Sequence, residues 1–130
     1  KHLVRYKGTF VAACGEKGIW YSTDGTTWTK SNVSATSNML CQHGNELLCA
    51  CSDGVRHSTD GMTWTLDTTV TSDIRIIKSA CGIVVATENG TTSYWWSSDG
   101  TTWTQDALNS YGGFGGYYGH ARRKGRLWVL

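Results

Sequence analysis

The hydrophobic residues of this chain fall in short runs that are separated by polar, glycine-containing turns. Four such runs follow glycines 8, 44, 82 and 125, and they cover residues 10–13, 47–50, 83–86 and 127–130. Runs this short, rich in valine, leucine and isoleucine and bounded by turn residues, predict β-strands rather than helices. A further short segment, read as a strand, follows each of the first three runs, at residues 19–21, 55–57 and 94–96. The pattern therefore predicts an all-β fold.

Each of these segments leads into an eight-residue motif that occurs three times. The motif reads Ser-Thr-Asp-Gly-Thr-Thr-Trp-Thr at 22–29, Ser-Thr-Asp-Gly-Met-Thr-Trp-Thr at 58–65 and Ser-Ser-Asp-Gly-Thr-Thr-Trp-Thr at 97–104. Asp-Gly between two strands predicts a tight hairpin, because both residues tolerate the positive φ that such turns demand. The tryptophan can bury a large apolar area between neighbouring sheets. A motif that returns at nearly constant spacing is typical of a repeat architecture.

Each repeat reads as four consecutive strands, which predicts a four-stranded antiparallel β-propeller blade. Three blades are complete, at about residues 3–31, 38–68 and 74–107, and half of a fourth covers about 117–130. Propellers close with four to eight blades. We therefore expect the chain to belong to a larger propeller or to self-assemble, so that the remainder of the ring is its partner.

The serine, aspartate, glycine and tryptophan of the motif are interpreted as structural rather than catalytic. Aspartate and serine side chains can bind turn amides where the strand ladder ends. Turn residues repeated in every blade are the usual sign of a propeller. The positions are Ser22, Asp24, Gly25, Trp28, Ser58, Asp60, Gly61, Trp64, Ser97, Asp99, Gly100 and Trp103.

The motif resembles the Asp-box, or BNR, repeat of sialidases and related β-propellers, written Ser-x-Asp-x-Gly-x-Thr-Trp. Here one residue fewer separates aspartate from glycine, and the resemblance covers about residues 8–130. It implies the propeller fold, and it implies a search for the arginine triad, Tyr-Glu nucleophile pair and acid–base aspartate of a sialidase. No arginine lies in a motif such as Arg-Ile-Pro, and the chain has no proline. We therefore assign no catalytic residue.

Charge and composition argue against several classes of function. The formal net charge is +2 and the only dense basic run lies at residues 122–126, so nucleic-acid binding is not predicted. A content of 39% hydrophobic and 17% charged residues is typical of a globular protein. The apolar runs are far too short to predict membrane insertion.

The five cysteines are an odd number, which excludes a fully disulfide-bonded framework. This favours synthesis in a reducing cytoplasm. Cys49 and Cys51 would share one face of a strand. Together with Cys41 and His43 they could form a metal site, but the spacing fits no common zinc pattern. We therefore predict no metal and no other cofactor.

Two aromatic segments exceed what a blade requires. Adjacent tryptophans at 95 and 96 would lie on opposite faces of a strand, where each can pack against a blade or offer a flat ring to a sugar. The segment 111–120 mixes glycines with aromatic residues, which suits either ligand recognition or a long connection between blades. The candidate ligand-binding residues are Trp95, Trp96, Tyr111, Phe114, Tyr117 and Tyr118.

The sequence favours a non-catalytic recognition or structural module over an enzyme. The expected ligand is a cell-surface glycan, and the expected setting is a phage tail in the virion or a bacterial surface protein. One alternative is a fragment of a sialidase-like glycoside hydrolase. A second is a purely structural scaffold that contacts other protein chains, because a propeller fold alone does not decide among these functions.

Overall fold

The computed structural model describes residues 1–107, 120–123 and 126–129, and every regular element among them is a β-strand. The first four strands are β1 (His2–Tyr6), β2 (Thr9–Ala13), β3 (Ile19–Ser22) and β4 (Thr29–Lys30). The next four are β5 (Ser37–His43), β6 (Glu46–Cys51), β7 (Gly54–Ser58) and β8 (Thr65–Leu66). They are followed by β9 (Ile74–Ala80), β10 (Ile83–Glu88), β11 (Ser93–Ser97), β12 (Thr104–Ala107), β13 (His120–Arg123) and β14 (Arg126–Val129).

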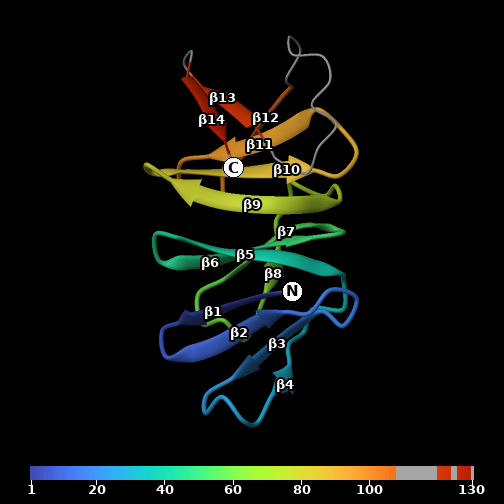
Figure 1. The fold of residues 1–130 in the computed structure, drawn as a ribbon, viewed down its shortest axis with the longest axis vertical. Helices are drawn as coiled ribbons and strands as arrows, with labels where there is room; N and C mark the ends of the chain where they lie inside the picture. The colour runs from blue at the N-terminus through green and yellow to red at the C-terminus, as the bar shows by residue number, and fades with distance from the viewer. Residues whose placement is uncertain (108–119, 124–125, 130) are drawn as a thin grey trace.

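These strands form three four-stranded sheets and one two-stranded sheet. Within each sheet every strand pairs antiparallel with the next strand in sequence, in the orders β1-β2-β3-β4, β5-β6-β7-β8, β9-β10-β11-β12 and β13-β14. Figure 1 shows the sheets stacked one after another, with the first sheet at one end and β13–β14 at the other. The predicted all-β fold of four-stranded antiparallel units is confirmed.

The strand registers show which positions are equivalent in the three four-stranded sheets. The serine that opens each Asp-Gly turn lies opposite Phe10, Leu47 or Val84 on the second strand of its sheet. From this anchor, strand alternation places every second residue on the same face. We call the face that holds Phe10 and its equivalents the upstream face, and the opposite face the downstream face.

The downstream face of each sheet packs against the upstream face of the next sheet. Between the first two sheets, the buried layer contains Tyr6, Val11, Ala13 and Ile19 from the first sheet and Leu40, Leu47, Cys49 and Trp64 from the second. Between the second and third sheets, it contains Leu48, Ala50 and Val55 against Ile77, Val84, Ala86 and Trp103. Burying one aliphatic side chain contributes about 1.5–3 kcal/mol, so these two layers hold the stack together.

The repeated motif forms the turn between the third and fourth strands of each sheet. In the first turn, Asp24 Oδ1 accepts hydrogen bonds from the amides of Thr26 at 2.8 Å and Thr27 at 2.7 Å. The aspartates of the second and third turns accept the same pair of amide bonds. The carboxylate therefore satisfies main-chain donors at the point where the strand ladder ends.

The glycine of the motif is needed where the turn touches the preceding sheet. Ser58 Oγ accepts the Gly61 amide at 2.8 Å, and Gly61 has a φ of 79°. A Cβ atom at this position would lie 2.8 Å from Cγ2 of Val11 in the first sheet. The second turn therefore approaches the first sheet more closely than any side chain allows.

Side chains also bind the main chain of the neighbouring sheet. Asn32, between β4 and β5, donates from Nδ2 to the Trp64 carbonyl at 2.8 Å and accepts the Trp64 amide on Oδ1 at 2.9 Å. Lys7 Nζ donates to the Thr59 carbonyl at 2.9 Å. These bonds fix the turn of the second sheet against the end of the first.

A buried valine anchors the chain where it leaves one sheet for the next. Val33 follows the first sheet and Val70 follows the second, and both are buried. A Cβ atom on Gly18 would lie 2.2 Å from the Val33 carbonyl oxygen, and one on Gly54 would lie 2.0 Å from that of Val70. The valine main chain therefore fills the space that a side chain would need just before β3 or at the start of β7.

Candidate binding surface

The two tryptophans proposed as ligand contacts lie on β11 and belong to different apolar layers. Trp95 is partly buried against the layer between the second and third sheets, and its Nε1 donates to Glu88 Oε1 at 2.7 Å. Trp96 packs on the opposite face, with Val85 and Tyr94. Both rings therefore contact neighbouring apolar side chains. The other four candidates, Tyr111, Phe114, Tyr117 and Tyr118, lie outside the described residues.

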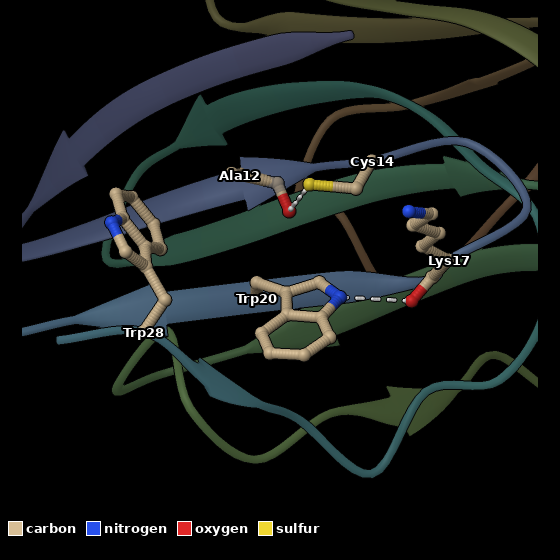
Figure 2. Close-up of a pocket in the computed structure, with 5 residues that line it drawn as sticks. All are labelled: Ala12, Cys14, Lys17, Trp20 and Trp28. Atoms are coloured by element: carbon tan, nitrogen blue, oxygen red, sulfur yellow. Dashed lines mark hydrogen bonds between the residues drawn. The ribbon is translucent and has the colours of Figure 1, made fainter.

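The first sheet carries an open hollow on its upstream face. It has a volume of ≈ 260 Å³ and is lined by Ala12, Cys14, Lys17, Trp20 and Trp28. Figure 2 shows Trp28 at one end, on the turn that follows β3, Ala12 and Trp20 in the middle, and Cys14 and Lys17 at the other end. Leu3 and Trp28 are large apolar side chains exposed on this sheet, at 59% and 37%.

Two polar groups at the edge of the hollow are already bonded within the first sheet. Trp20 Nε1 donates to the Lys17 carbonyl at 3.0 Å, and Cys14 Sγ donates to the Ala12 carbonyl at 3.7 Å (Figure 2). The hollow therefore offers apolar and aromatic surface, with the Lys17 ammonium as its charged group. Such a surface suits contact with apolar side chains.

The three motif aspartates are held in their ionised form. Bonds from the amides three and two residues further on lower the pKa of Asp24, Asp60 and Asp99 below the usual range. The amide three residues on has the largest effect in each turn. A general acid at neutral pH needs the opposite shift, so these carboxylates are suited to holding turns rather than transferring protons.

Glu88 is the most densely bonded carboxylate of the third sheet. It accepts from Ser72 Oγ at 2.7 Å, Trp95 Nε1 at 2.7 Å, Gln105 Nε2 at 3.1 Å and Thr91 Oγ1 at 3.3 Å. Burial raises the pKa of Glu88, but these donors outweigh burial and lower the pKa. The carboxylate therefore links strands β10, β11 and β12 to the connection before β9.

The four residues considered for a metal site are His43, Cys41, Cys49 and Cys51, and Cys41 packs partly buried against the layer between the second and third sheets. His43 lies 2.8 Å through Nδ1 from Ser79 Oγ and 3.0 Å through Nε2 from the Ser98 carbonyl, so it links the second and third sheets. Cys49 and Cys51 lie in the buried layer with their Sγ atoms 3.6 Å apart. In the part of the chain that the structure describes, no three histidine, cysteine or acidic side chains gather where they could hold a metal ion. The same residues include no helix of the length and apolarity that a membrane span requires.

The sequence matches no family model and no curated protein. The fold is similar to solved structures of β-propeller proteins. A GH74 enzyme of Niastella koreensis aligns with 79% of this chain at 18% identity and a TM-score of 0.63. An ancestral GH74 enzyme aligns with 79% at 14% identity and a TM-score of 0.62, and YCF48 from Cyanidioschyzon merolae with 84% at 11% and 0.61.

The chain spans only a part of each of these proteins. It covers 17% of either GH74 enzyme and 38% of YCF48. Identities this low show the fold and carry no ligand or reaction with them. The predicted fold class is thereby confirmed as β-propeller blades.

Sequence reasoning missed the hollow on the first sheet. Trp28 occupies the same motif position as two buried tryptophans, so the motif gave no reason to single it out. A signal was nevertheless present, because Phe10, Ala12 and Cys14 alternate on one face beside Trp20. The sequence does not reveal that this face, unlike its two equivalents, is covered by no described sheet.

Proposed function

We propose that this chain is a non-catalytic structural and recognition segment of a β-propeller, in which further blades complete the ring. One observation carries the proposal: most of the acidic side chains are used in structural bonds. All ten lie within residues 1–107, where each can be followed. The pKa values of Asp24, Asp60, Glu88 and Asp99 are all lowered by hydrogen bonds that belong to turns or sheets.

Most of the remaining carboxylates also hold the fold. Asp67 Oδ1 accepts the amides of Thr69 at 2.7 Å and Val70 at 3.0 Å, next to the buried valine of the second connection. Asp53 forms an ion pair with Arg56. A glycosidase needs two carboxyl groups that flank the sugar, one of them kept protonated by a raised pKa. The lowered pKa values of Asp24, Asp60, Glu88 and Asp99 are the opposite of what such an acid requires, which supports a non-catalytic role.

We further propose that the turns are Asp boxes of the BNR, sialidase-like type and that the ligand is a cell-surface glycan. The setting would be a phage tail or a bacterial surface. The support is the motif itself and the glycine- and aromatic-rich segment at 111–120, because aromatic rings can stack on the apolar face of a sugar. Trp95 contributes less to this proposal, since its indole N–H already binds Glu88.

The experiment joins a binding assay with an activity assay on the 130-residue protein. We expect binding to a subset of glycans on an array, and no turnover of a fluorogenic sialoside or of other fluorogenic glycosides. Phe114→Ala should lose the glycan signal, whereas Thr101→Ala, an exposed turn residue, should keep it. Unchanged binding in Phe114→Ala, Trp95→Ala and Trp96→Ala alike would contradict aromatic stacking.

A glycoside hydrolase fragment is the second candidate, because two of the similar structures are GH74 enzymes. Turnover of any glycoside would favour it over a binding module. If that turnover were lost when one acidic residue was replaced by the corresponding amide, the replaced residue would be identified as a catalytic group. If the protein neither binds a glycan nor turns one over, the purely structural scaffold, which contacts only other blades or chains, remains as the function.

A further inference from the structure

The three sheets repeat one upstream face, and only the first copy is open. At the motif tryptophan, Trp28 is 37% exposed, whereas Trp64 is 2% and Trp103 is 7% exposed. The three residues occupy the same place in sequence, seven residues into the eight-residue motif. Their different exposure therefore reflects what lies against each sheet and not a difference in the sheets themselves.

The inner strands show the same contrast. Leu3, Leu40 and Ile77 are equivalent by register, since each lies opposite the equivalent residue of the second strand. Leu3 is 59% exposed, whereas Leu40 is 3% exposed and Ile77 is fully buried. Cys14 and Cys51 are likewise equivalent, and only Cys51 is buried. The open face therefore has apolar residues at the same positions as its two equivalents. The difference is that a sheet covers each of those equivalents.

The covered copies show what such a face binds. The upstream face of the second sheet meets a downstream face built from Tyr6, Val11, Ala13 and Ile19. The covering sheet also forms polar contacts at the edge of the interface. Lys7 donates to the carbonyl of Thr59, the second residue of the motif. Asn32 binds both the amide and the carbonyl of Trp64. In the next interface, His43 Nε2 reaches the equivalent carbonyl, that of Ser98.

We propose that the open upstream face of the first sheet is the docking surface for one further propeller blade, which the rest of the propeller polypeptide supplies. This inference rests on the proposed role of the chain as a propeller segment. The partner face carries a small aliphatic layer like that of Val11 and Ala13. A side-chain donor at the end of its inner strand binds the Thr23 carbonyl, and an asparagine in its connection binds the main chain of Trp28.

A second copy of this chain, docked face to face, fits less well. Arg5 lies on the open face with its guanidinium 5.5 Å from the Phe10 ring centroid, and Lys17 lines the hollow. A two-fold contact would place these cations and their symmetry mates in the same interface. The blade-to-blade contact, by contrast, is one that the chain already makes twice.

A glycan also fits the hollow less well than a blade does. Sugar hydroxyls that enter a site need hydrogen-bond partners, because unpaired polar groups are costly to bury. Two of the donors that line the hollow, Trp20 Nε1 and Cys14 Sγ, already bind carbonyls of the first sheet, which leaves the Lys17 ammonium as a donor for a sugar. Apolar side chains require no such partners.

The test uses Cys14 as a reporter and adds one blade to the full chain. A second copy of residues 1–38 is placed directly before His2, because His2 and Met39 are equivalent by register. In the added copy, Cys14 is replaced by serine, so that peptide mass mapping sees only the original Cys14. N-ethylmaleimide labelling of Cys14 is then timed against the exposed Cys81 in the same molecule.

We expect Cys14 to be labelled at least tenfold more slowly in the extended protein than in the 130-residue protein, with Cys81 unchanged. Val11→Asp in the added copy alone should restore the faster labelling. Equal labelling of Cys14 in the two proteins, whether the added blade folds or not, would overturn the proposal.

Two further results in the 130-residue protein would also overturn it. The first is protection of Cys14 that grows with protein concentration, which would identify a second copy as the occupant. The second is protection by array-positive oligosaccharides, which would identify a glycan. Turnover of a glycoside would refute the non-catalytic function and leave the labelling result unaffected, so the two failures are distinguishable.

Discussion

Replacing Trp64 by alanine tests whether burial between sheets sets the contribution of the repeated tryptophan. Trp64 is 2% exposed and lies in the layer between the first and second sheets. Substituting a buried aromatic residue by alanine costs about 3–5 kcal/mol, because it removes transfer free energy and leaves a cavity. We expect Trp64→Ala to lower the free energy of unfolding by about this amount.

Trp28→Ala is the matched control, since it changes the same motif position on the open face. Water can fill the space that this indole leaves, and part of its surface is already exposed. We therefore expect a loss of about 1–2 kcal/mol. Trp64→Phe is a second control: within the described residues, Trp64 Nε1 is buried without a hydrogen-bond partner. Removing an unpaired donor offsets part of the lost volume, so the loss should be well below that of Trp64→Ala.

The assay is urea denaturation followed by far-UV circular dichroism at 25 °C. Stacked repeats can unfold in more than one step, so the free energies are compared only where the slope m is unchanged. Equal losses for Trp28→Ala and Trp64→Ala would refute the reasoning. That result would mean that the tryptophan acts within its own hairpin, regardless of the sheet that lies against it.

Three further predictions concern the turns and the buried thiols. Gly61→Ala should lower the free energy of unfolding by about 1–2 kcal/mol more than Gly25→Ala in the same urea assay. Both glycines have a φ of 79°, but only a Cβ at 61 meets a neighbour at 2.8 Å. Equal losses for the two variants would count against this explanation. Because the folded-state pKa of Asp60 is lowered, its contribution to stability is present above about pH 4 and is lost as the pH falls through that lowered pKa. Asp60→Asn should therefore weaken the acid dependence of the melting temperature, and an unchanged dependence would contradict the role of the turn bonds. Burial raises the pKa of Cys49, so N-ethylmaleimide at pH 8 should modify the exposed Cys81 first, and the reverse order would show that the layer opens readily.

The sequence was sufficient to predict the strands and their grouping, because the repeated turns are local chemistry. An aspartate that accepts two amides and a glycine with positive φ define a hairpin without help from the rest of the fold. The alternation that puts Trp95 and Trp96 on opposite faces is equally local, and they do join different layers. Whether either ring binds a ligand stays a prediction.

The burial of equivalent residues could not be predicted from the motif. Trp28 and Trp64 stand in the same eight-residue context, yet their exposure differs because one sheet has a described neighbour on its upstream side and the other has none. The connecting valines escaped notice for a related reason. Val33 and Val70 lie in polar segments with no periodicity of their own, and their importance depends on glycines at the start of the third strand of each sheet or just before it.

The contact between a glycine and the carbonyl of the connecting valine has a consequence for how such a chain can diverge. The contact is made by main-chain atoms, so it holds each connection in place without specifying the side chains on either face. Equivalent positions can therefore exchange phenylalanine, leucine and valine, as at Phe10, Leu47 and Val84, while the path from sheet to sheet is preserved. A gene for such a chain can grow by copying one unit, and the copies can then lose their sequence likeness long before they lose their common geometry.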